Sequence, residues 1–262
     1  MKEKKQIKID KKQAWRIASN DVYQLISLGI MLAIWAIASV AEDNPLVLPM
    51  PDVVLARFFV LGGEEGFWTS VGWTLLRTLI CFVISFVLAM IFAVLGGLFS
   101  PIHRIMSPIV SVLRSAPTVA VILILYAFLS GNAMAIVVGF LIAFPIMYSA
   151  FYSAIVGVDK DLVEMAKVYK VRPLDIVKSV YIPSITPCLF DTSKSTLSLT
   201  LKVVIAAEIL ANVTNSIGGK IQVANASFEI AYLLAYTLVA IVFSFVLEGV
   251  VLGAKKIWEV AR

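Results

Sequence analysis

The longest uncharged stretch of this sequence decides its fold class. It runs from Ser115 to Val158 and is forty-four residues long. As a single α-helix it would extend roughly 66 Å, about twice the hydrocarbon thickness of a bilayer. The triplet Ser130-Gly131-Asn132 near its middle is a turn signal. We therefore predict two membrane-spanning helices here, joined at that triplet.

Four other stretches have a similar character. Three contain no charge, and the fourth contains only Lys202 and Glu208; they are Val22–Val40, Thr78–Phe99, Ile230–Leu247 and Ser195–Ala211. Their apolar residues are continuous instead of alternating, which is typical of membrane helices and not of membrane strands. The sequence therefore predicts an all-α polytopic membrane protein with six transmembrane helices, forming a single domain over residues 1–262.

Composition excludes the main alternatives to a membrane protein. Hydrophobic residues make up 60% of the chain and charged residues 15%, against about 45–50% and 25% in soluble domains. So much apolar surface would be exposed in a soluble globule, and it is also incompatible with disorder. The two cysteines, Cys81 and Cys188, are too few for a disulfide scaffold and are expected to be buried thiols.

The distribution of Lys and Arg predicts the orientation. An even number of crossings places three basic segments on one side: the N-terminal segment 1–20, the loop 158–190 and the C-terminal tail. The opposite side holds only Arg57 and Lys220. By the positive-inside rule, both termini and the loop are cytoplasmic. The net charge of +5 then reflects topology and affinity for anionic lipid; no basic cluster interleaved with aromatic residues indicates a nucleic-acid partner.

The cytoplasmic loop is predicted to contain two short helices. Asp159 or Asp161 can cap the first helix. Pro173 suits the first position of the second helix, and Pro183 is expected to end it.

The first loop helix has one apolar face, formed by Leu162, Ala166 and Tyr169. A helix of about ten residues is marginal in water by itself, so this face needs a partner. Two partners are compatible with the pattern. The helix either rests on the lipid interface or inserts into a groove on a cytoplasmic protein.

The same loop resembles the motif of binding-protein-dependent ABC transport permeases: E-A-A, three residues, G, nine residues, I-x-L-P. This sequence supplies Glu164, Met165 and Ala166, then Lys170 at the Gly place and Pro183 at the end, without a gap. It departs from the motif at Met165 and at Lys170. The Gly normally permits a left-handed turn, and a Lys on the same backbone costs on the order of 1 kcal/mol.

Further segments extend this resemblance to the nitrate, sulfonate and taurine branch of the family. They occur in the family's order and are Leu48-Pro49-Met50-Pro51, Leu76-Arg77-Thr78, Leu113-Arg114-Ser115-Ala116-Pro117, Lys202–Glu208 and Ser216-Ile217-Gly218-Gly219. The resemblance implies the type I ABC importer permease fold in a bacterial inner membrane. It also implies a homodimer of such chains, two ATPase subunits below it, and a solute-binding protein outside. The first loop helix would be the coupling helix that sits in a cleft of the ATPase.

The chain itself is not expected to be an enzyme. It has no G-x-x-x-x-G-K-[ST] loop, so ATP and magnesium are expected in the ATPase subunit and no cofactor in this chain. With His103 as its single histidine, expected in a cytoplasmic loop, it offers no histidine cluster for a metal. For the solute, the resemblance points to small anions such as nitrate, sulfonates or taurine. Similar permeases carry neutral heterocycles such as thiamine-precursor pyrimidines.

Charged residues inside spans are expensive and should face protein or a water-filled path. On a helical projection, Ser195, Ser198, Leu199 and Lys202 share one face, our candidate lining of the path, with Lys202 attracting an anionic solute. We add Glu208 as a candidate, although helix geometry prevents it from pairing with Lys202. The alternative is that both charges make structural contacts with neighbouring helices or a second copy.

Two arginines lie near the ends of predicted spans. Arg77 and Arg114 are expected to snorkel or to pack between helices.

Two other classes of function are less compatible with the sequence. A secondary transporter or channel would need a buried ion-coupling set and repeated halves, which the sequence does not display. A membrane scaffold would not need the spacing of the coupling loop.

Overall fold

The computed structural model describes residues 11–44, 46–129 and 131–260, and every regular element within these ranges is helical. The first ten residues of the predicted segment 1–20 lie outside the described residues. The elements are α1 (Lys11–Glu42), α2 (Pro51–Leu61), α3 (Phe67–Leu98), α4 (Ser100–Ser115), α5 (Thr118–Tyr126), α6 (Gly131–Val156), α7 (Lys160–Val168), α8 (Pro173–Ile176), the π-helical turn η1 (Val177–Tyr181), α9 (Ile182–Leu210), α10 (Ile217–Ala226) and α11 (Ile230–Val260).

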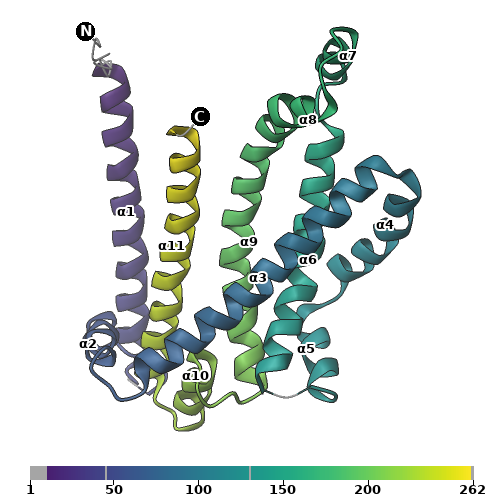
Figure 1. Cartoon of the computed structure of the whole chain (residues 1–262). Coiled ribbons are helices and arrows are strands. Elements are labelled where there is room, and N and C mark those ends of the chain that lie inside the picture. Colours follow the sequence, from purple (N-terminus) through teal and green to yellow (C-terminus); the bar gives the residue numbers. More distant parts are fainter. Residues whose placement is uncertain (1–10, 45, 130, 261–262) are drawn as a thin grey trace.

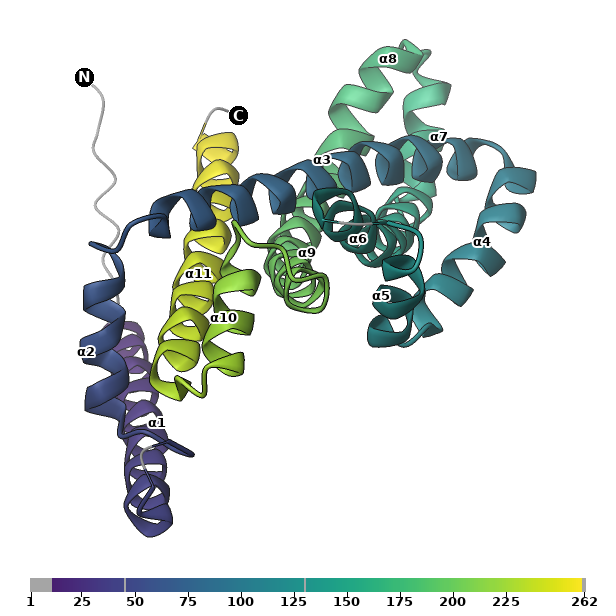
Figure 2. The same ribbon diagram turned by 90° about the horizontal axis from the view of Figure 1, so that it is seen from below.

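Helices α3, α6 and α9 form the centre of the molecule. Helix α3 runs obliquely across α6 and α9, and α11 packs beside α9 (Figure 1). Gly139 of α6 allows the close crossing with α3, because a Cβ there would lie 2.7 Å from Sγ of Cys81. Cys81 is fully buried and Cys188 is half-buried, both as free thiols. Helix α1 stands to one side, and its contacts are mainly with α2 and the turn that precedes it (Figure 2).

Four helices are long and apolar enough to cross a membrane by themselves: α1, α3, α6 and α11. Helix α9 has 29 residues, or about 43 Å, which is long enough for a crossing. It is not one of the four strongly apolar helices, and it carries four charged residues: Asp191, Lys194, Lys202 and Glu208. With the bent pair α4 and α5 as a fifth candidate, the described helices fit the predicted six crossings.

The third predicted crossing is broken instead of straight. Helix α4 and helix α5 meet at a bend of 94°, where Ala116 is extended (φ −68°, ψ 130°). The reason is Pro117, since a proline disfavours helical geometry in the residue before it. Helix α5 has nine residues, about 14 Å, and is too short to cross alone. The predicted span from Ser115 is therefore not one straight helix: Ser115 ends α4, and the bent pair of α4 and α5 is the candidate for this crossing.

The ends of the chain are arranged as an even number of crossings requires. The start of α1, the end of α11 and the projecting helix α7 lie at one end of the molecule, whereas α2 and α10 lie at the other (Figure 1). Helix α2 begins at Pro51, since proline suits the first position of a helix. That the shared end is cytoplasmic stays a prediction.

Pro183 does not end a loop helix, contrary to the prediction. The chain stays helical from Pro173 through α8, η1 and α9. Proline lacks an N–H group, and helices accommodate such a gap by locally changing their hydrogen-bond register. Here η1 takes the wider π register, in which the N–H of Ile182 donates to the carbonyl of Val177, directly before Pro183. The second loop helix is thus continuous with the predicted fifth span.

Candidate functional site

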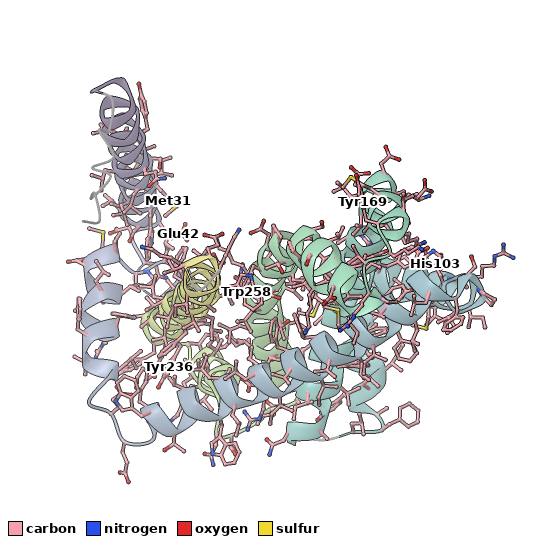
Figure 3. The ribbon with its side chains drawn as sticks, turned by 45° about the horizontal axis from the view of Figure 1, so that its top comes forward. Met31, Glu42, His103, Tyr169, Tyr236 and Trp258 are labelled. Atoms are coloured by element: carbon pink, nitrogen blue, oxygen red, sulfur yellow. The ribbon has the colours of Figure 1, made fainter. Side chains whose placement is uncertain are left out.

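Helix α7, the predicted coupling helix, projects from the rest of the chain. None of its nine residues is buried, and Tyr169, directly after it, lies in the same projecting part of the loop (Figure 3). Leu162, Met165 and Tyr169 fall on one side of the helix and are 44%, 54% and 77% exposed. Glu164 is also exposed and Ala166 is half-buried. An apolar face is therefore presented outward by a helix too short to be stable alone.

The loop geometry around α7 follows the motif despite its two departures. Asp159 caps the helix, its side chain accepting a hydrogen bond from the N–H of Asp161 at 2.9 Å. Lys170 adopts the left-handed conformation, with φ of 54°. The N–H of Val171 donates to the carbonyl of Ala166 at 3.0 Å, which completes the usual left-handed end of an α-helix. Lys170 thus occupies the conformation of the Gly it replaces.

Helix α9 carries an open stripe along its length. Asp191, Ser195, Leu199 and Lys202 are all exposed in the chain, at the three- and four-residue spacing of one helix face. Among the described residues, no carboxylate lies within ion-pair distance of Lys202. Ser198 is turned away from this stripe: it is buried and its hydroxyl lies 2.5 Å from that of Ser244 in α11. Of the predicted face, the structure therefore exposes Ser195, Leu199 and Lys202 together.

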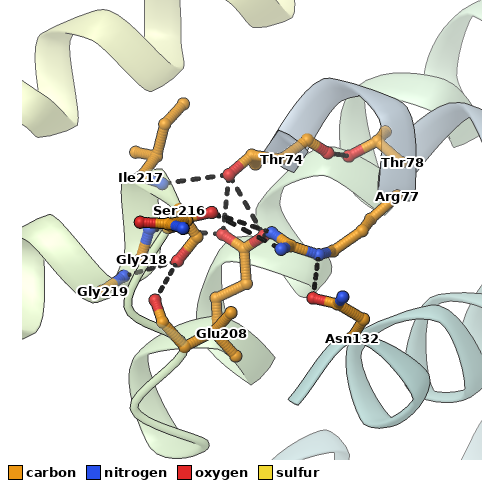
Figure 4. A network of polar contacts seen from close by, with 11 residues as sticks. Thr74, Arg77, Thr78, Asn132, Glu208, Ser216, Ile217, Gly218 and Gly219 are labelled. Carbon is orange, nitrogen blue, oxygen red and sulfur yellow. Dashed lines mark hydrogen bonds and ion pairs between the residues drawn. The ribbon is translucent and has the colours of Figure 1, made fainter. Parts of the chain in front are cut away.

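Glu208 occupies a different environment from the rest of the candidate lining. Its side chain is fully buried, and its Oε1 lies 2.7 Å from Nη1 of Arg77 in α3 (Figure 4). Thr74 donates from its hydroxyl to the same carboxylate at 2.9 Å, and the N–H of Gly218 donates at 3.2 Å. Nε of Arg77 donates to Oδ1 of Asn132 at 2.9 Å. This network joins α3, α6, α9 and α10.

The structure decides between the alternatives for both residues. Glu208 makes structural contacts with neighbouring helices and does not share the open stripe with Lys202. Arg77 packs between helices and does not snorkel, because it is 3% exposed and bound to Glu208. The sequence did contain a signal for this pair. Two opposite charges lie at the outer ends of two predicted spans, and charges inside membranes are usually paired.

Helix α4 contributes one residue that differs from expectation and one that does not. His103 lies inside α4 instead of in a loop, and its ring stacks on that of Tyr152 in α6, with centroids 3.6 Å apart. Arg114 is exposed and directs Nη1 toward Oγ of Ser149, 3.4 Å away. Polar side chains of α4 and α6 thus face each other across a groove. Among the described residues, no three His, Cys, Asp or Glu side chains form a group that could hold a metal ion.

A family model now decides what kind of protein has this architecture. The model described as "Binding-protein-dependent transport system inner membrane component" matches residues 86–252, which include α4 to α10 and the projecting loop. The chain belongs to this family. It is a permease of the ABC importer class, and its resemblance to the nitrate, sulfonate and taurine branch is confirmed by its relatives.

Three curated relatives belong to that branch by name. The permease is 23% identical to a taurine transport system permease of Escherichia coli, over 90% of this chain and 88% of that one. It is 30% identical to an E. coli permease named for aliphatic sulfonates, over 71% of each chain. It is 27% identical to a nitrate import permease of Synechococcus elongatus, over 71% and 70%. These relatives do not favour the neutral-heterocycle alternative.

Solved structures confirm the fold class. Chains of the MetNI methionine ABC transporter in inward-facing conformations superpose with a TM-score of 0.60 at 18% identity, covering 70% of the permease and 91% of the matched chain. A second crystal form gives a TM-score of 0.58 at 21% identity. The permease therefore has the all-α type I importer fold. The relatives are transport proteins and not enzymes.

Proposed function

We propose that this permease forms one half of the translocation path of an ATP-driven importer for a small anionic solute of the sulfonate or nitrate type. Its partners are a second copy of the chain, an ABC ATPase that binds ATP and magnesium, and an external solute-binding protein. The permease itself binds no cofactor. It lies in a bacterial inner membrane as a single domain, with residues 1–20, the loop 158–190 and the C-terminus in the cytoplasm.

The observation that carries the ATPase proposal is the outward apolar face of α7. Leu162, Met165 and Tyr169 are exposed at the projecting end of the loop. A helix seated by this face in a cleft of the ATPase would transmit rigid-body movements of that subunit to the spans. We assign Glu164, Met165, Ala166 and Lys170 to this contact. We place Pro183 at the joint between loop and span, where the π-helical turn adjoins α9.

The anion proposal rests on the open stripe of α9. A lysine exposed by its own chain inside a membrane span is costly unless it faces water or protein. We therefore infer that Lys202 and Ser195 line the path at the contact with the second copy. The hydroxyl of Ser198 supports this face from behind, through its bond to Ser244 in α11.

The test of the ATPase contact uses variants of the exposed face. We expect Tyr169→Asp and Met165→Asp to reduce co-purification of the neighbouring ATPase from membranes, because a carboxylate is buried without a partner in the cleft. The control is Lys167→Gln, on the opposite side of α7. Unchanged ATPase binding and unchanged ATP-driven uptake by both Asp variants would show that α7 rests on the lipid interface instead.

A further inference from the structure

The groove between α4 and α6 has an unusual lining for a membrane protein. It has a volume of about 620 Å³, and its wall is formed by five serines, two tyrosines, one histidine, one arginine and a single valine. From α4, His103, Ser107, Ser111 and Arg114 recur at helical spacing and face the groove together. This volume is within the range of about 300–1,000 Å³ that is typical of small-molecule sites.

We propose that this groove binds a small oxyanion, a sulfonate or nitrate, and forms a solute subsite of the permease separate from the α9 stripe. This inference rests on the proposed function for its solute class. Every polar side chain in the lining can donate a hydrogen bond, and the lining contains no carboxylate. Arg114 adds a permanent positive charge, and a guanidinium binds two oxygens of a planar or tetrahedral anion at once.

The groove is held in shape by contacts on its α6 side. The rings of His103 and Tyr152 stack with an interplanar angle of 3°, and Nδ1 of His103 lies 3.0 Å from the hydroxyl of Tyr148. Tyr148 is itself 1% exposed. Ser149 donates to the carbonyl of Pro145 at 2.8 Å, which leaves its oxygen to accept from Arg114. Ser149 and the His103–Tyr148 pair are therefore used in holding the wall and Arg114 in place, which lowers the entropic cost of binding. The groups that we assign as donors to the anion are Arg114, Ser107 and Ser111 of α4.

The placement of Arg114 argues against a merely lipid-facing surface. Arg114 is exposed in the last turn of α4, just before the bend at Ala116 and Pro117. The groove surrounds it with hydroxyl groups instead of apolar side chains. Hydrogen-bond donors inside a membrane domain need partners, and water or an anion in the groove would supply them. Because the phosphate of an anionic lipid has the same chemistry as a free oxyanion, the experiment must separate these two sources.

The experiment measures reagent access in the full-length permease in nanodiscs. A cysteine introduced as Ser111→Cys is labelled with 2-sulfonatoethyl methanethiosulfonate, which is itself an alkylsulfonate, and with its trimethylammonium counterpart. We expect Arg114→Gln to lower the ratio of anionic to cationic labelling rates by about fivefold or more, because a unit charge a few ångströms away is removed. Arg114→Lys should keep the preference. Ser184→Cys, exposed at the start of α9, is the control site, and the chain with only Cys81 and Cys188 gives the background.

The ligand is identified by which molecules protect Ser111→Cys from labelling. In phosphatidylcholine nanodiscs, methanesulfonate and nitrate should slow labelling of Ser111→Cys by the cationic reagent but not labelling of Ser184→Cys. This protection should be lost with Arg114→Gln. Protection by added phosphatidylglycerol alone, with neither free anion effective, would overturn the proposal in favour of a lipid headgroup site. An unchanged rate ratio after Arg114→Gln would also overturn it.

This design separates the groove from the importer function. Labelling needs neither the ATPase nor the binding protein, so it reports on the groove even when the transport assignment fails. If the assembled transporter takes up solute with ATP but anions do not slow labelling of Ser111→Cys, only the proposed anion site in the groove is contradicted. Anion protection without any ATPase association would contradict only the proposed importer.

Discussion

Arg77 in α3 and Glu208 in α9 form a buried ion pair 131 residues apart in the sequence, with Nη1 and Oε1 separated by 2.7 Å. Thr74 and the N–H of Gly218 also donate to the Glu208 carboxylate, and Arg77 also donates to Oδ1 of Asn132 and to the carbonyl of Asn215. Burying two charges is costly, and the cost is offset only when the geometry and the surrounding hydrogen bonds are good. The pair therefore fixes how α3, α6, α9 and α10 meet at one end of the fold.

Removing one partner of this pair should strongly destabilise the permease. We expect Arg77→Gln to lower the free energy of unfolding by about 3–5 kcal/mol, because Glu208 stays buried without its counter-charge. Unfolding in mixed detergent and SDS micelles measures this. The control is Lys194→Gln, whose partner Glu248 lies 3.4 Å away at a partly exposed position; we expect about 1 kcal/mol or less. Equal losses in the two variants would contradict the role of the buried pair.

Gly218 should tolerate no side chain, although it lies in a helix. A Cβ at this position would lie 2.5 Å from Cβ of Glu208 and 2.6 Å from the carbonyl oxygen of Ile205. We expect Gly218→Ala to destabilise the fold by about 1–3 kcal/mol, since backbone must move to make room. Gly249 in α11 has open space around it, so Gly249→Ala should stabilise by about 0.5–1 kcal/mol. The same unfolding measurement compares them, and a neutral Gly218→Ala would show that α10 can shift freely.

Most of the spans could be predicted because their signal is local. The ends of α1, α3, α6 and α11 differ from the predicted spans, but length and hydropathy were sufficient to place each helix. The bend before α5 could not be found from gaps between charges. The uncharged stretch ends at Arg114, although α4, which precedes α5 in the candidate bent span, keeps its polar residues on one face. Ala116 before Pro117 was the local signal that the rule passed over.

The partners of individual polar residues were harder to predict, because pairing depends on how helices meet. Helical spacing correctly separated Glu208 from Lys202, but it contained no information about Arg77 on another helix. Ser198 was assigned to the open face, yet it lies close enough to the inner side of α9 to reach Ser244. A projection of one helix gives the order of residues around its axis. The boundary between the exposed and buried sides is set by its neighbours.

Lys170 offers a test of the loop geometry. Its φ of 54° is unfavourable for a residue with a Cβ, so Lys170→Gly should stabilise the end of α7 by about 1 kcal/mol. Hydrogen exchange of the α7 amides should slow about fivefold as a result, if they exchange by local opening. Lys167→Gly, inside the helix, should accelerate exchange instead. Unchanged exchange of the α7 amides in Lys170→Gly would show that the turn after α7 carries no strain.

Substitution of Lys202 tests whether this residue lines the translocation path. It is exposed on α9 without a carboxylate partner among the described residues, and its positive charge should raise the local concentration of an anionic solute. In proteoliposomes containing the assembled transporter, we expect Lys202→Met to lower kcat/KM for sulfonate or nitrate uptake by about tenfold or more, whereas Lys202→Arg retains most of it. Lys194→Met on the same helix, facing Glu248, is the matched control. Normal uptake by Lys202→Met would remove Lys202 from the path, and failure of that variant to assemble with its second copy would assign the lysine to a structural contact there.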